Sequence, residues 1–364
     1  MTDSRRKVAC PYKSLPASAY WRRAIASVPP EEIDPVTLTT FEIDAADRIA
    51  TAGSCFAQHI ARYIKNSGGS YFVTEPGHQL LPPDVRRRFN YGTFTARFGN
   101  VYTVRQLLQL LERAYGQRTP VDDVWQEEDS SLIDPFRPYI QPGGFRSMAE
   151  YEADRQTHFR AVRRMVEESD VFVFTLGLTE AWENVTDGTV YAICPGCGAG
   201  QHVEGESRFR NFEVGEVMAD LASSIEFLRE RNPGLRILLT VSPVPLIATF
   251  SPQHVLAATT YSKSVLRVAA QAMVGRFDHV DYFPSFEIIT SQASRGAYFA
   301  EDLRDVEEVG VRHVMRTFFR HYCPGMSFPD EQAVSAPRAK GRRRSDSARV
   351  NDVICDEQQL EKAF

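Results

Sequence analysis

The sequence has no long apolar run. No stretch approaches the roughly 20 consecutive apolar residues of a membrane-spanning helix, and the N-terminal part is charged and proline-containing rather than signal-like. Positive charge is not in excess either. The net charge is −5 and the pI is near 6.0, which argues against nucleic acid or an anionic membrane surface as the main partner. These absences predict a protein of the cytoplasm with no membrane span.

Cysteine is sparse, and phosphate-binding loops are missing. The six cysteines are scattered and form no disulfide framework. Cys194 and Cys197 have CxxC spacing with His202 nearby, but a structural zinc site needs further ligands, and Pro195-Gly196 favours a tight turn. Neither GxxxxGK[ST] nor a GxGxxG after a strand is present. We therefore predict no metal and no cofactor. The sequence leaves the oligomeric state open.

What the sequence does contain is an alternation of buried strands and long helices. Apolar runs predict strands at residues 171–178, 235–243 and 279–289. Periodic patterns predict helices at residues 101–116, 149–169, 214–234 and 253–273, the last ending before Gly275. This alternation is typical of an α/β domain with a mostly parallel sheet covered by helices on both faces. Ligands of such sheets bind at the carboxyl ends of the strands.

The chain divides into a body with an extension at each end. Residues 1–47 are predicted to be an N-terminal extension that packs on the body through the aromatic "YWRRAI" segment, and residues 48–325 to be the catalytic domain. Residues 326–364 contain few large apolar residues and a basic run, which predicts a mostly disordered tail.

The first strand-end loop is "TAGSCFAQHI" at residues 51–60, where an apolar run passes into an amphipathic helix. Gly53 permits a sharp turn, and Ser54 would lie among unpaired backbone N–H groups at the positive end of the helix, a position suited to an oxyanion. The same position suits a serine that only caps the helix. Cys55 is either a thiol with a lowered pKa or a residue of the core.

Polar side chains follow the later predicted strands as well. Thr179 and Glu180 come directly after the strand at 171–178, with Trp182 close behind. Ser242 follows the next strand, and His254 and Lys263 lie on the helix after it. Near the end of the body, Asp302 lies in a loop and His313 on the following helix, so both are candidates for the same site.

These motifs resemble the GSCFA-domain family. The resemblance rests on ordered segments from residue 48 to about residue 322: "AGSCFA", "FGNVYTVRQLLQL", "DPFRP", "FTLGLTEAW", "LLTVSPVPL", "YSKSVLR" and "YFPSFEI". That family is similar to SGNH/GDSL hydrolases and acyltransferases. The resemblance implies a three-layer α/β/α, flavodoxin-like (SGNH hydrolase-like) fold with a serine nucleophile after the first strand.

The resemblance also implies roles for single residues. Ser54 matches the nucleophile, although Ala52-Gly53 replaces the usual Gly-Asp before it. Gly99, followed by Asn100, matches the oxyanion glycine, with Gly92 as a competitor. Thr179 takes the place of the asparagine donor. Asp302 and Asp305 occupy the Asp-x-x-His motif, so the histidine position holds an aspartate.

A serine needs a base to become a nucleophile, and the motif lacks one. His313 is the favoured replacement, and His254, Asp302 and Asp305 are alternatives. With Ser54, Asp302 and His313 as catalytic residues, and Glu180, Trp182, His254 and Lys263 binding substrate, the expectation is a serine esterase or O-acyltransferase. Its substrate would be a small-molecule or glycan ester. The alternatives are a carbohydrate- or ligand-binding module with a degenerate site, or a Cys55 nucleophile.

Overall fold

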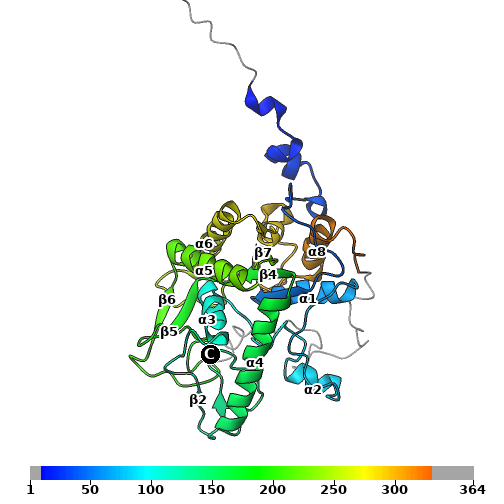
Figure 1. The fold of residues 1–364 in the computed structure, drawn as a ribbon. Coiled ribbons are helices and arrows are strands. Elements are labelled where there is room, and N and C mark those ends of the chain that lie inside the picture. Colours follow the sequence, from blue (N-terminus) through cyan, green and yellow to red (C-terminus); the bar gives the residue numbers. More distant parts are fainter. Residues whose placement is uncertain (1–9, 330–364) are drawn as a thin grey trace, which may run out of the picture.

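The computed structural model describes residues 10–329, and its core is a four-stranded parallel sheet in the order β1-β4-β7-β8 (Figure 1). The strands are β1 (Ile49–Gly53), β4 (Val171–Leu176), β7 (Arg236–Val241) and β8 (Val280–Tyr282). A single parallel bridge from Tyr71 to Ile49 extends the sheet beyond β1. If the segment at Tyr71 is counted as the second strand along the chain, the strand order in the sheet is 2-1-3-4-5, as in flavodoxin-like folds.

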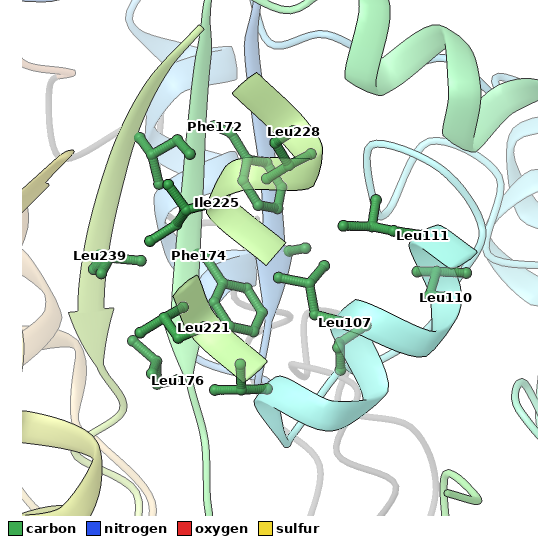
Figure 2. Packing of buried hydrophobic residues seen from close by; sticks show 14 of the residues in the cluster. Leu107, Leu110, Leu111, Phe172, Phe174, Leu176, Leu221, Ile225, Leu228 and Leu239 are labelled. Carbon is green, nitrogen blue, oxygen red and sulfur yellow. The ribbon is translucent and has the colours of Figure 1, made fainter. Parts of the chain in front are cut away.

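Helices cover both faces of this sheet because its strands alternate their side chains between two apolar cores. Phe172 and Phe174 of β4 belong to one core, shown in Figure 2, while Val171 and Val173 belong to the other. The first core is covered by α3 (Val104–Ala114), α4 (Met148–Glu168), α5 (Val214–Arg231) and α6 (Val255–Arg276). The second is covered by α1 (Ala57–Asn66), α7 (Ser285–Thr290) and α8 (Glu308–Tyr322). The predicted three-layer α/β/α fold is confirmed.

Smaller elements surround the layers. Two antiparallel pairs consist of β2 (Trp125–Gln126) with β3 (Leu132–Ile133), and β5 (Glu180–Asn184) with β6 (Ser207–Asn211). The helical turns are η1 (Pro11–Ser14), η2 (Ala17–Ala19), η3 (Arg22–Ala26), η4 (Pro30–Glu32), η5 (Gln292–Ser294) and the short α2 (Pro83–Arg88). Among the described residues, none of the helices has the length and apolar character needed to cross a membrane.

The predicted strands and helices are present with ends that differ by a few residues, and two of these differences have a clear physical cause. The run at 279–289 forms a strand only as far as Tyr282, because Pro284 has no N–H for a sheet ladder and instead precedes α7. The helix predicted to stop before Gly275 continues to Arg276. Its last turns are held by the buried side chains of Ala269, Ala270 and Met273, and this packing outweighs the cost of a helical glycine.

The N-terminal extension contacts the body through residues other than those expected. Trp21 is 61% exposed, so "YWRRAI" supplies no buried tryptophan anchor, and Figure 1 shows the first helical turns projecting from the body. Ile33 and Ile43 are buried instead, and the Ile43 N–H donates to the Tyr322 carbonyl. The domain boundaries at 47 and 325 stay predictions, and most of the predicted tail, residues 330–364, lies outside the described residues.

Candidate active site

Ser54 lies at the carboxyl end of β1, where the chain presses against β4. Gly53 has a φ of +129°, and a Cβ there would lie 2.2 Å from the Thr175 carbonyl oxygen. Only glycine therefore fits this corner. The Ser54 N–H donates to the same Thr175 oxygen at 3.1 Å. This N–H group is thus engaged in the fold.

The Ser54 side chain does not cap the helix. The N-cap of α1 is Phe56, and no side-chain capping bond is present there. Ser54 is 3% exposed, and its Oγ has no hydrogen-bond partner within the described part of the chain. A buried hydroxyl without a partner costs free energy and calls for an explanation. A site that binds a ligand or substrate at this atom is one such explanation.

The residues around Ser54 come from the ends of three neighbouring strands. We call this space, about 10 Å³ in volume, the Ser54 pocket. Its lining consists of Ser54 and Cys55 after β1, Gly177 and Leu178 after β4, Ser242, Val244, Pro245 and Leu246 after β7, and also Tyr102 and Lys263. The predicted edge of the sheet is therefore where Ser54, the residues after β4 and Ser242 meet.

The amine of Lys263 also lines this pocket. Lys263 is 3% exposed, and its Nζ donates a 2.6 Å hydrogen bond to the Gly177 carbonyl. Gly177 itself lies against Ser54, since a Cβ at position 177 would be 3.1 Å from the Ser54 Cβ. Helix α6 thus places an amine in the wall of the pocket that holds the candidate nucleophile. The amine comes from the "YSKSVLR" segment.

A much larger pocket, about 530 Å³, adjoins the Ser54 pocket and shares Tyr102, Leu178 and Leu246 with it. We call it the aromatic pocket. The other residues of its wall are Gln106, Glu180, Ala181, Trp182, Tyr191, Ala192, Ile193, Cys194, Pro195, Gly196, Cys197, His202, Phe209, Ile247, Ala248, Thr249 and Phe250. It contains Glu180 and Trp182, two of the predicted substrate-binding residues.

Ring contacts and a half-buried carboxyl group shape the aromatic pocket. The Trp182 ring packs edge-on against Phe250, with centroids 4.9 Å apart, and against Phe209 at 6.2 Å. Glu180 opens β5 and accepts a 2.6 Å hydrogen bond from the Thr249 hydroxyl. Burial raises the pKa of Glu180, and its hydrogen bonds only partly offset this.

Thr179 does not lie where the expected oxyanion donor should. Its hydroxyl donates to Asn211 Oδ1 at 2.7 Å, and its N–H donates to Ser262 Oγ at 3.0 Å. Both donors thus tie the end of β4 to β6 and α6. Thr179 is fully buried, and it is not among the residues that line the Ser54 pocket.

The Gly99-Asn100 segment lies beside the end of β1 but lines another cavity. The Val101 N–H donates to the Gly53 carbonyl at 2.8 Å, which holds the segment next to the strand end. Gly99 and Asn100 line a small separate space together with Arg137. Asn100 Oδ1 accepts a hydrogen bond from Gln58. The structure therefore places this segment near Ser54 but not in its pocket.

The structure does not bring His313 to Ser54. Tyr298 Oη and the Ile33 carbonyl oxygen lie 2.8 Å from the two ring nitrogens of His313. Burial lowers the pKa of His313, and the bond to Ile33 only partly opposes it. This histidine ties α8 to the N-terminal extension. The Ile33 carbonyl, which is distant in the sequence, is bonded to the ring nitrogen at which a serine hydroxyl would otherwise bind.

The other predicted partners of Ser54 are also elsewhere. Asp302 is exposed, and its Oδ1 accepts from the N–H groups of Arg304 and Asp305, so the carboxylate closes its own loop. His254 is exposed and caps α6, with Nδ1 accepting from the Leu256 N–H. None of these side chains lines the Ser54 pocket.

Sequence reasoning missed one buried pair, His158 with Glu75. His158 Nδ1 lies 2.9 Å from Glu75 Oε2, and Arg97 also contacts this glutamate. Nε2 has no partner within the described residues, and the ring lines a cavity of about 30 Å³ with Arg137. The cavity is separate from the Ser54 pocket. Nothing local in the sequence indicates the pair, because its members lie 83 positions apart.

The CxxC segment forms the turn that its Pro-Gly pair predicts. The Cys197 N–H donates to the Cys194 carbonyl at 3.0 Å, and Gly196 has a φ of +82°. Cys194 and Cys197 are both in the reduced state. Within residues 10–329, no cluster of three or more His, Cys, Asp or Glu side chains is arranged to hold a metal ion.

Comparison with known proteins gives one family and a remote structural likeness. The model of the GSCFA family matches residues 48–318, which include β1, Ser54, the strand ends and Lys263. Among solved structures, the Clostridium thermocellum family 3 carbohydrate esterase is similar at 11% identity and a TM-score of 0.26. The likeness covers 76% of this chain and 94% of that one. A search of curated proteins gives no match.

Proposed function

This chain belongs to the GSCFA family, and from the geometry of the Ser54 pocket we propose that it is a serine-dependent acyl-ester hydrolase or O-acyltransferase. The observation that carries the proposal is the Ser54 hydroxyl. It is buried at the carboxyl end of β1, has no hydrogen-bond partner among the described residues, and shares its pocket with an amine. A serine that served only the fold would be expected to cap α1 or to bond a neighbour.

Lys263 is the proposed base. In its neutral amine form, Lys263 accepts the Ser54 proton as Oγ attacks the ester carbonyl carbon. The carbonyl oxygen becomes an oxyanion. When the carbon–oxygen double bond re-forms, the alcohol leaves and receives the proton from Lys263. Water or a second hydroxyl then attacks the acyl-enzyme in the same way. Ser-Lys pairs are a known variant of the serine–histidine arrangement, and buried lysines are suited to the role of base.

The oxyanion requires donors other than Thr179 and the Ser54 N–H, because both are engaged in the fold. We assign the stabilisation of the oxyanion to the N-terminal end of α1, which begins just after Ser54 and Cys55. The N-terminal end of a helix carries partial positive charge, which favours an anion there. The assignment leaves the Cys55 thiol as a group that lines the Ser54 pocket without taking part in the reaction.

The proposal includes an O-acyl group on a carbohydrate as a substrate, as the resemblance to SGNH enzymes implies. The similar solved structure is that of a carbohydrate esterase, but a likeness of this degree carries no argument for the substrate of this chain. The second candidate is a binding module that has lost turnover. One observation favours it: Ser54 Oγ makes no hydrogen bond to a histidine within the described residues.

The deciding experiment is labelling of the full-length protein with a fluorophosphonate ester probe, followed by peptide mass spectrometry. We expect one labelled site, at Ser54, and loss of the label in Ser54→Ala. The matched control is Ser242→Ala, because Ser242 is also a buried serine of the Ser54 pocket. This control should label normally.

Three results would contradict the proposal. Folded wild-type protein that never labels would favour the binding module. Label on Ser242 would move the nucleophile to the end of β7. Ester cleavage that survives Ser54→Ala but is lost in Cys55→Ala would identify the thiol as the nucleophile.

A further inference from the structure

We propose that the aromatic pocket binds the acyl chain of the ester, and that this chain is an apolar one of several methylene groups rather than an acetyl group. The inference rests on the proposed function, because it names the acyl part of the substrate on which Ser54 would act. It goes beyond that function because it assigns the acyl chain of the substrate to the aromatic pocket.

The first argument is the position of the pocket next to the reacting atom. The aromatic pocket and the Ser54 pocket share Tyr102, Leu178 and Leu246 in their walls, so the larger space begins on the other side of these three residues. The Ser54 pocket itself measures about 10 Å³, at the lower limit for one water molecule. Entry of an ester therefore requires the Leu178 and Leu246 side chains to move apart.

The second argument is that several polar groups of the wall are already hydrogen-bonded within the protein. The Tyr191 hydroxyl donates to Asp122 and accepts from Asn184, each at 2.9 Å. The Gln106 amide accepts from the Thr103 N–H and donates to the Tyr191 carbonyl. Glu180 is held by Thr249. With these hydrogen bonds satisfied, the wall offers few polar groups to hold a sugar ring.

The third argument is the chemical character of the rest of the wall. Trp182, Phe209 and Phe250 form one aromatic cluster, and Leu178, Leu246 and Ile247 add aliphatic surface. No lysine or arginine is among the described residues that line the pocket. A phosphorylated or carboxylated group would thus find no cation here and would meet Glu180. An uncharged apolar chain fits this surface better.

Size excludes acetyl as the natural occupant. One water molecule takes up about 30 Å³ in the liquid, and an acetyl group has only three heavy atoms. The aromatic pocket, at about 530 Å³, is many times larger. It falls within the range of roughly 300–1,000 Å³ that small-molecule sites have. An acetyl ester would leave most of the apolar wall in contact with water.

The test uses methyl ketones as uncleavable acyl analogues, so that binding is measured whether or not Ser54 turns over. Binding of 2-butanone, 2-hexanone and 2-octanone to the full-length Ser54→Ala protein is followed by calorimetry. We expect affinity to rise roughly threefold to fourfold per methylene, which corresponds to the ~0.8 kcal/mol of one buried CH₂ group. Trp182→Ala should flatten the series, whereas Trp21→Ala, at an exposed tryptophan outside the pocket, should not.

A second variant protects the test from a folding defect in Trp182→Ala. Ala248 is exposed and lines the pocket, so Ala248→Trp fills space without disturbing the core. It should weaken 2-octanone at least tenfold and leave 2-butanone unchanged. Equal affinity across the ketone series, or a series that Ala248→Trp does not alter, overturns the inference. Such a result would leave the proposed function standing if Ser54 still reacts with fluorophosphonate. Absence of that label would instead contradict the proposed function, and the ketone series would still test whether the aromatic pocket binds an apolar chain.

Discussion

Lys263 Nζ donates a 2.6 Å hydrogen bond to the carbonyl oxygen of Gly177, the residue whose Cα packs against Ser54. This bond fixes the amine beside the strand ends without using the Ser54 hydroxyl. If Lys263 is the base, Lys263→Met should lower the rate of Ser54 acylation by roughly 10²–10⁴-fold, the usual contribution of a general base. Rapid mixing with a p-nitrophenyl ester measures that rate.

The control for this variant is Lys65→Met, at an exposed lysine on α1 that bonds the Gly92 carbonyl. The pH profile separates a base from a merely structural lysine. If Lys263 is the base, the dependence of the acylation rate on pH in the wild type should be lost in Lys263→Met. A slow variant that keeps the wild-type pH profile would show that Lys263 only supports the fold.

Thr179 is predicted to matter for stability and not for catalysis. Replacing it by valine leaves Asn211 Oδ1 without its 2.7 Å donor, and we expect a loss of about 1–3 kcal/mol in the free energy of unfolding. Loss of an oxyanion donor would instead lower kcat by roughly 10²–10³-fold. Urea unfolding and kcat, measured on the same preparation of Thr179→Val, distinguish the two. A large fall in kcat at unchanged stability would restore the oxyanion role.

The corner before Ser54 should tolerate only glycine. In Gly53→Ala, the new Cβ would lie 2.2 Å from the Thr175 carbonyl oxygen at a φ that L-residues rarely adopt, so we expect destabilisation of more than about 2 kcal/mol. Gly275→Ala is the matched control, because this glycine lies inside α6 with open space around it. That change should stabilise by about 0.5–1 kcal/mol. Equal effects of the two substitutions in urea unfolding would contradict the tight contact.

The sheet and Ser54 were predictable because their signals are local. A short apolar strand, a glycine and then a serine before an amphipathic helix all lie within a short stretch of chain. The surroundings of His313 were not predictable, since its contact with Ile33 spans 280 positions. The hydrogen bond between Thr179 and Asn211 likewise joins two distant positions, one after β4 and the other at the end of β6. Lys263 was expected to bind substrate, and only the folded chain reveals its contact with Gly177.

Stability should fall on mild acidification, and His59 is one cause. Burial and the nearby Arg62 lower the pKa of His59 to about 3. The unfolded chain therefore binds a proton at His59 below about pH 6.5 that the folded chain rejects. The stabilising effect is complete above pH 6.5 and is lost as the pH falls towards 3. Near the middle of this window, His59 changes the free energy of unfolding by about 1.4 kcal/mol per pH unit. His59→Gln should flatten the dependence of the urea midpoint on pH, and an unchanged slope would contradict the assignment.

Cysteine reactivity should follow the buried and exposed environments of the thiols. Burial, followed by the neighbouring Cys197, raises the pKa of Cys194 to about 12, and burial raises that of Cys323 to about 12 as well. The thiolate is the reactive form, so both should alkylate slowly at pH 8. Cys10 is exposed and should react first with iodoacetamide. Peptide mass spectrometry over a time course gives the order of modification. If Cys194 were modified as fast as Cys10 while Cys323 stayed protected, the wall of the aromatic pocket near Cys194 would be open to water, and the apolar site proposed for the acyl chain would have to be reconsidered.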